Sequence, residues 1–261
     1  MNSVETATRS GPFKHPRLLL CEGEDDLAFF HRLILDHSLQ KFHIRSTANK
    51  KGMSGGNTKF ESALEAIKGN RRYDVLRNVV LVSDNDDDPD SSFQKLRKQI
   101  IGAGFQAPEK RLEQGPGIPA ITIIMVPLNG MNGNLECLCK EAAQRKDSTV
   151  ASHTDHFLAQ LNADNWPTTR QGKLWLRANI AARATDPCVS LGGVFRDPKH
   201  FNLIPLRDRS FDCLVEVLCS IGRSSNPPLK PSGVHGKSQL SQKRDQTPQG
   251  PQMRPRLGRS R

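Results

Sequence analysis

The sequence of 261 residues predicts an α/β fold in which a parallel-type sheet is flanked by helices. Three observations support this. Short apolar segments alternate with segments of helical periodicity in the first half, as in a parallel α/β sheet. The segment NVVLVSDND at 78–86 contains four consecutive apolar residues at 79–82, which is typical of a strand covered on both faces. The second half carries helical patterns, which predicts a helical C-terminal extension.

The first strand is expected at Arg17–Cys21, where RLLLC is apolar and ends in a turn at Glu22-Gly23. A helix is expected next, because its apolar residues recur at near-helical spacing and the acids at its start suit a helix N-terminus. These apolar residues are Leu27, Phe30, Leu33, Ile34 and Leu35. A second strand is expected in KFHIRSTA at 41–48, and a second helix ends near Lys68.

The third strand is the segment at 78–86, and Pro89 can open the helix that follows near 90–103. The fourth strand is PAITIIMVP at 119–127, which is rich in β-branched residues. Further helices are expected near 133–146, 153–162, 170–184 and 210–221.

Charge and composition divide the chain into a domain and two tails. Residues 1–15 are expected to be disordered, and 16–221 to form one domain, with its core at about 16–130 and the helical extension at about 131–221. Residues 222–261 hold nine Lys or Arg, one Asp and six Pro, and are expected to form a disordered basic tail. This tail carries +8 of the net charge of +11, which makes DNA or RNA a possible partner; the tail could equally be a solvating appendage.

The chain is expected to be cytoplasmic. Residues 1–15 are polar and lack the apolar segment of a signal peptide. No apolar run approaches the roughly 18 residues needed to cross a membrane. The six Cys would stay reduced in the cytosol. They form no pair of C-x2-C motifs, so we interpret them as buried or neutral thiols rather than zinc ligands.

Acidic residues follow two of the expected strands. Glu22 follows the first, with Asp26 four residues on, and Asp84, Asp86 and Asp88 follow the third. Ligands of open α/β sheets bind beyond the carboxyl ends of the strands. Alternate residues of an extended segment point to one side, so the three Asp side chains are expected to share one space.

Carboxylates crowded in this way need protonation or a bound cation. Oxygen ligands suit Mg²⁺, with Mn²⁺ as an alternative, and such a cation stabilises charge in phosphoryl transfer. A solvated turn followed by helix N-terminal charges is the other interpretation of the Asp cluster. The residues alone leave both open.

Four segments carry a resemblance to a known family. LLLCEGEDDLAFF at 18–30 and VVLVSDNDDD at 79–88 resemble the Glu-Gly-x-x-(Asp/Glu) and Asp-x-Asp segments of Toprim domains. VPLNGMNGNLECL at 126–138 and KLWLRANIAA at 173–182 are similar to stretches of small stand-alone bacterial Toprim-like proteins, the domain of unknown function 3226. The resemblance covers about residues 16–220 and implies a Toprim-like α/β domain.

The resemblance implies roles for individual residues. Glu22 would be a metal ligand or a general acid/base, and Asp84 and Asp86 the metal-binding pair. Glu136 would help to bind metal, and Lys173 would neutralise charge in the transition state. Asp26 and Asp88 remain candidates for a second metal site or for support.

The function expected from these residues is Mg²⁺-dependent phosphodiester chemistry of the nuclease type on DNA or RNA. A topoisomerase needs a nucleophilic Tyr, and the one Tyr here, Tyr73, lies outside any recognisable breakage domain. Two alternatives stay open. One is a non-catalytic nucleic-acid-binding or scaffold protein, and the other is a metal-dependent phosphatase or nucleotide-processing enzyme. The oligomeric state is left open.

Overall fold

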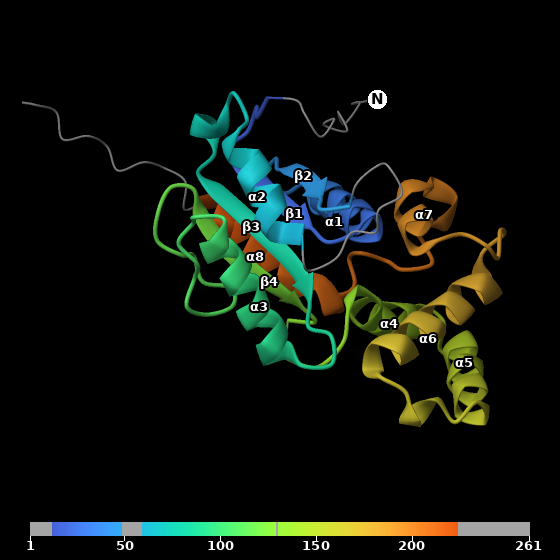
Figure 1. The fold of residues 1–261 in the computed structure, drawn as a ribbon. Coiled ribbons are helices and arrows are strands. Elements are labelled where there is room, and N and C mark those ends of the chain that lie inside the picture. The colour runs from blue at the N-terminus through green and yellow to red at the C-terminus, as the bar shows by residue number, and fades with distance from the viewer. Residues whose placement is uncertain (1–11, 49–58, 129, 224–261) are drawn as a thin grey trace, which may run out of the picture. The chain divides into compact units, whose positions relative to one another are not determined.

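The computed structural model describes residues 12–48, 59–128 and 130–223 (Figure 1). All of them belong to one compact unit, Met1–Asn226, and the second unit, Pro227–Arg261, lies outside the described residues. The disorder expected for residues 1–11 and 224–261 therefore falls on parts of the chain that the structure does not describe.

A four-stranded sheet forms the centre of the unit, with the strand order β2-β1-β3-β4 and every neighbouring pair parallel. The expected α/β fold is confirmed. Cys21 at the end of β1 pairs with Val82 of β3, so the next residue, Glu22, comes level with Ser83. The strands are β1 (Arg17–Cys21), β2 (His43–Ser46), β3 (Asn78–Asp84) and β4 (Ala120–Val126).

The helices follow the expected order, with one addition. The six-residue helix α7 was not predicted, because two turns hold too few residues to show a period. The helices are α1 (Glu24–Asp36), α2 (Phe60–Lys68), α3 (Pro89–Gly102), α4 (Leu135–Lys146), α5 (Ser148–Gln160), α6 (Thr168–Arg183), α7 (Leu191–Arg196) and α8 (Asp212–Arg223). Short 3₁₀ helices are η2 (Tyr73–Val75), η3 (Ala163–Asn165), η4 (Pro198–His200) and η5 (Arg209–Phe211).

Helices cover both faces of the sheet, which explains the continuous apolar strands. Side chains alternate between the faces, so Leu18 and Leu20 of β1 pack with α2 and α3. Leu19 and Cys21 face the other core, which α1 and the helices α4 to α8 complete. Figure 1 shows α2 and α3 in front of the sheet and α8 behind it. Within the described residues, no helix is both long and apolar enough to cross a bilayer.

Within the described part of the N-terminal segment, residues 12–15, Phe13 packs against the sheet, while Pro12 and Lys14 are exposed. The side chain of Phe13 is fully buried, with its ring 5.3 Å from that of His43, and the guanidinium of Arg45 lies over it. His43 Nε2 accepts hydrogen bonds from the backbone N–H groups of Lys14 and His15, at 2.7 and 2.9 Å. Average composition could not reveal that a single aromatic anchors the segment.

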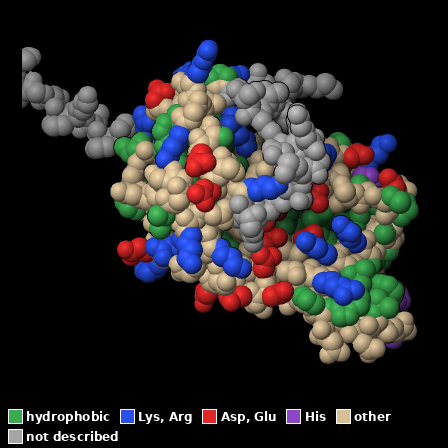
Figure 2. All heavy atoms as spheres, viewed as in Figure 1, with side chains coloured by type: hydrophobic (Ala, Val, Ile, Leu, Met, Phe, Trp, Pro, Cys, Tyr) green, Lys and Arg blue, Asp and Glu red, His purple; other side chains and the backbone are tan. Residues whose placement is uncertain are grey.

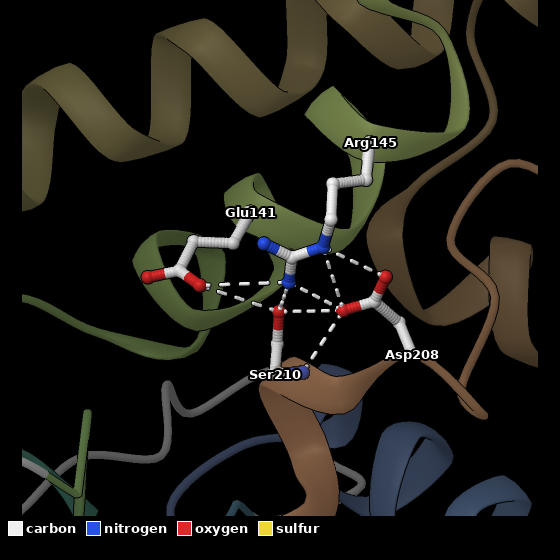
Figure 3. Close-up of polar contacts among 4 residues, drawn as sticks. All are labelled: Glu141, Arg145, Asp208 and Ser210. Atoms are coloured by element: carbon white, nitrogen blue, oxygen red, sulfur yellow. Dashed lines mark hydrogen bonds and ion pairs between the residues drawn. The ribbon is translucent and has the colours of Figure 1, made fainter.

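An ion-pair cluster joins α4 to the segment that leads into α8 (Figure 3). Arg145 donates to both carboxylate oxygens of Asp208 and to the hydroxyl of Ser210, and its Nη2 lies 3.5 Å from Glu141. The hydrogen bonds from Arg145 hold the pKa of Asp208 well below its usual range. The cluster therefore fixes the segment that leads into α8 against α4, the helix that carries Glu136.

Candidate active site

Glu22 is the first residue after β1, and the end of β3 holds its side chain in place. Its Oε1 accepts a hydrogen bond from the hydroxyl of Ser83 and another, of 3.2 Å, from the backbone N–H of Asp84. Ser83 is buried, so water does not replace its hydroxyl. The parallel register of β1 and β3 therefore positions this carboxylate.

Asp84 is the last residue of β3 and points toward the start of α4. Its Oδ1 accepts a hydrogen bond of 3.1 Å from the backbone N–H of Leu135, the first residue of that helix. Asn134 caps α4 by accepting from the N–H of Cys137 at 3.1 Å. The N-terminus of a helix favours negative charge, so α4 helps to hold a carboxylate at this strand end.

Helix α6 brings Lys173 close to Glu136 because α4 and α6 approach each other tightly. A Cβ added at Gly172 would lie 2.5 Å from Sγ of Cys137, so the absence of a side chain permits this contact. Residues 136 and 173 directly adjoin this contact, one on each helix. The close packing thus sets where the lysine stands relative to the acid.

Five of the residues singled out from the sequence line one pocket of about 340 Å³: Glu22, Asp26, Asp84, Glu136 and Lys173. They come from the end of β1, from α1, β3, α4 and α6. The remaining lining residues are Gly23, Glu24, Asp25, Leu135 and Leu191. Two larger pockets, of about 630 and 740 Å³, contain none of the expected site residues, so size alone does not identify the site.

Burial and crowding make the charged forms of these acids unfavourable. Burial and the nearby charge of Asp26 raise the pKa of Glu22 to about 7, although the hydrogen bond from Ser83 acts to lower it. Burial raises the pKa of Asp84 well above its usual value, and the neighbouring carboxylates raise it further. Burial also raises the pKa of Asp26 and Glu136, and the positive charge of Lys173 partly offsets this.

Asp86 and Asp88 are not among the described residues that line this pocket, but the charge of Asp86 is near enough to raise the pKa of both Glu22 and Asp84. Asp86 has a left-handed φ of 53°, and its backbone exchanges hydrogen bonds of 2.9 and 2.8 Å with Gly133. The chain turns there, so the alternation of an extended strand is lost. Asp88 instead caps α3 by accepting a hydrogen bond of 3.0 Å from the N–H of Ser91.

Sequence reasoning missed three residues that shape the pocket. Ser83 donates a hydrogen bond that holds the Glu22 side chain. The register of β1 and β3 could have revealed this contact, because it brings residue 22 level with residue 83. Asp25 accepts a hydrogen bond of 2.8 Å from the N–H of Gly192, which attaches α7 to the pocket wall. Glu24 accepts a hydrogen bond of 2.6 Å from the hydroxyl of Ser46 on β2. No local pattern could reveal the last two contacts, because their partners lie far away in the chain.

The donors in this pocket are of the chemical type that Mg²⁺ prefers, because they are carboxylate oxygens, and their crowding favours a positive charge between them. Among residues 12–48, 59–128 and 130–223, no three Asp, Glu, His or Cys side chains are arranged to hold one ion together. Mg²⁺ is commonly bound by one or two carboxylates with waters as its other ligands. The fit of Mg²⁺ to this pocket therefore rests on the carboxylate type of the donors and on their negative charge.

Comparison with known proteins identifies the family. Residues 16–187 match DUF3226, a family described as protein of unknown function. The chain belongs to the DUF3226 family. No curated protein and no solved structure matches it. The DUF3226 segment extends from just before β1 to just after α6, so it contains every acidic residue of the pocket and Lys173, whereas Leu191 lies beyond it.

Proposed function

We propose that this DUF3226 protein hydrolyses phosphodiester bonds of DNA or RNA with Mg²⁺, or alternatively Mn²⁺, as its cation. One observation carries the proposal: Glu22, Asp26, Asp84 and Glu136 line a single pocket together with Lys173 at the carboxyl end of a parallel sheet. The resemblance of the Glu22 and Asp84 segments to Toprim domains supports the same chemistry.

Glu22 and Asp84 are the residues that would hold the cation, since hydrogen bonds fix one oxygen of each carboxylate. Asp26 and Glu136 lie on the helices α1 and α4 beside them and would support its charge. When bound, the cation would polarise the phosphoryl group and lower the pKa of a bound water molecule, which makes that water easier to deprotonate. Alternatively, Glu22 would accept the proton of the attacking water as a general base.

Among the described residues that line the pocket, Lys173 is the one basic residue. Phosphodiester hydrolysis gathers negative charge on the phosphoryl oxygens in the transition state, and a nearby ammonium group stabilises that charge. The side chain starts from an exposed position on α6, so it can meet a substrate that arrives from solvent.

A cleavage assay with supercoiled plasmid, oligonucleotides and nucleotides, in Mg²⁺ or Mn²⁺, tests the proposal. Glu22→Gln and Asp84→Asn are each expected to slow cleavage by about 100-fold or more, because each removes a charge that the reaction uses. Asp87→Asn is the matched control: it makes the same change in the same acidic segment, at an exposed residue outside the pocket, and should leave the rate unchanged.

Cleavage that survives both pocket substitutions would reject this site. Nucleic-acid binding without turnover would instead favour a scaffold protein, and release of phosphate from nucleotides without strand cutting would favour a phosphatase.

A further inference from the structure

Helix α6 carries basic residues on one face and no acidic residue. Its sequence, TTRQGKLWLRANIAAR, contains four basic residues, and three of them are spaced at i, i+3 and i+7. At 3.6 residues per turn, this spacing places Arg170, Lys173 and Arg177 within a narrow arc of the helix. All three are exposed. We call these three residues the α6 stripe.

Within the part of the chain that the structure describes, no member of the α6 stripe forms an ion pair, although other cations nearby do: Lys140 pairs with Asp155 at 3.7 Å and Arg196 with Glu24 at 3.8 Å. Lys173 faces the acids of the pocket, and its charge acts on Asp26 and Glu136. The guanidinium of Arg170 lies over the ring of Trp166, 3.9 Å from its centroid. Its charge is held in place and remains open to an anion.

The stripe runs past the acidic pocket. Lys173 lines the pocket, and the other two charges lie about one turn before and one turn after it. Seven residues of helix cover about 10.5 Å, enough to face several consecutive phosphates at about 3.4 Å of rise per nucleotide. Figure 2 shows Lys and Arg side chains gathered in the region of α6, next to Asp and Glu side chains.

We propose that the α6 stripe binds the sugar-phosphate backbone of a nucleic-acid strand and lays it across the acidic pocket at Lys173. This deepens the proposed function, since it rests on that pocket as the place where the strand is cut. The N-cap residue of α6, Pro167, makes no side-chain cap hydrogen bond, and the positive end of the helix dipole adds positive potential beside Arg170. Contacts of this kind recognise phosphates, so binding is independent of base sequence and weakens with salt.

Fluorescence anisotropy of a labelled single-stranded 20-mer DNA, measured with the full chain in Mg²⁺ over a series of salt concentrations, tests the inference. The double variant R170Q/R177Q is expected to reduce the slope of log affinity against log salt by about 1.4, at about 0.7 for each lost phosphate contact. At 0.1 M salt this corresponds to roughly 25-fold weaker binding. A denaturing gel checks that the oligonucleotide is intact.

K95Q/K98Q is the matched control. It removes two exposed charges from α3, on the opposite face of the sheet, and should leave the slope unchanged. The basic C-terminal residues are the same in both double variants, so their contribution cancels. An unchanged slope in R170Q/R177Q, or an equal loss in the control, would overturn the inference.

The test distinguishes a failure of nucleic-acid binding by the α6 stripe from a failure of the proposed hydrolysis. If binding depends on the stripe but no strand is cut, the inference stands and the proposed hydrolysis fails. If strands are cut by R170Q/R177Q at the wild-type rate and affinity, the hydrolysis stands and the inference fails.

Discussion

Glu22 is held where an ionised carboxylate is costly. It accepts two hydrogen bonds from β3, yet burial and neighbouring acids still raise its pKa to about 7. In an unfolded chain a Glu titrates near its usual pKa of 4.5. Between these values the native state binds more protons than the unfolded state, so the contribution of Glu22 to stability falls as pH rises and is lowest above pH 7.

Replacement of this charge should therefore stabilise the protein in alkaline buffer. Glu22→Gln keeps an oxygen that can accept from Ser83 and Asp84, and removes the ionisation. Without divalent cations, its free energy of unfolding at pH 8 should exceed that of the wild type by on the order of 1–3 kcal/mol, and the difference should shrink toward pH 4.5. Urea denaturation at several pH values measures this, and a difference that is independent of pH would contradict it.

Individual residues show how far the sequence predicted the site. Glu22 and Asp84 could be placed from the sequence, because each directly follows an apolar strand and parallel strands end at one edge. Asp86 could not, because its left-handed φ is one of the conformations that Asp tolerates but does not require. Asp88 followed by Pro89 did carry a readable helix-start signal, but its alternate spacing from Asp84 equally allowed the ligand interpretation.

At the scale of elements, α3 depends on Asp88 for its start. The Asp88 carboxylate accepts from Ser91, and Pro89 occupies the first turn. Asp88→Ala should lower the free energy of unfolding by about 1 kcal/mol, the usual cost of a lost N-cap, and should leave metal-dependent cleavage unchanged. Denaturant melts and the plasmid assay measure the two effects. If the variant lost cleavage without losing stability, Asp88 would instead be a residue of the active site.

The elements differ in how well the sequence revealed them. In the part of the chain that the structure describes, all four strands and seven of the eight α-helices were expected close to their positions, because their apolar periods are long enough to recognise. Helix α7 has six residues, and its attachment to the pocket depends on Asp25, far away in the chain. The start of α5 was placed too late, since Asp147, which accepts from the N–H of Val150, already caps it.

For the whole molecule, a cation that binds only the native pocket should raise global stability. At a Mg²⁺ concentration ten times its Kd, the gain is about 1.4 kcal/mol. For a domain of this size, that corresponds to a rise in Tm of roughly 3–6 °C. The rise should disappear in the double variant Glu22→Gln/Asp84→Asn and persist in Asp87→Asn. An equal rise in all three proteins would mean that Mg²⁺ acts elsewhere.

The larger core of the molecule extends past the end of the DUF3226 segment at residue 187. Its buried side chains include Val194 and Phe195 of α7, Phe211, and Leu214 and Leu218 of α8. The end of the sequence match to the family is therefore not the end of the packed domain. A homologue that kept only the shared segment would expose the apolar side chains that α7 and α8 cover here, and would need another chain, another appendage or more polar residues at those positions to stay in solution.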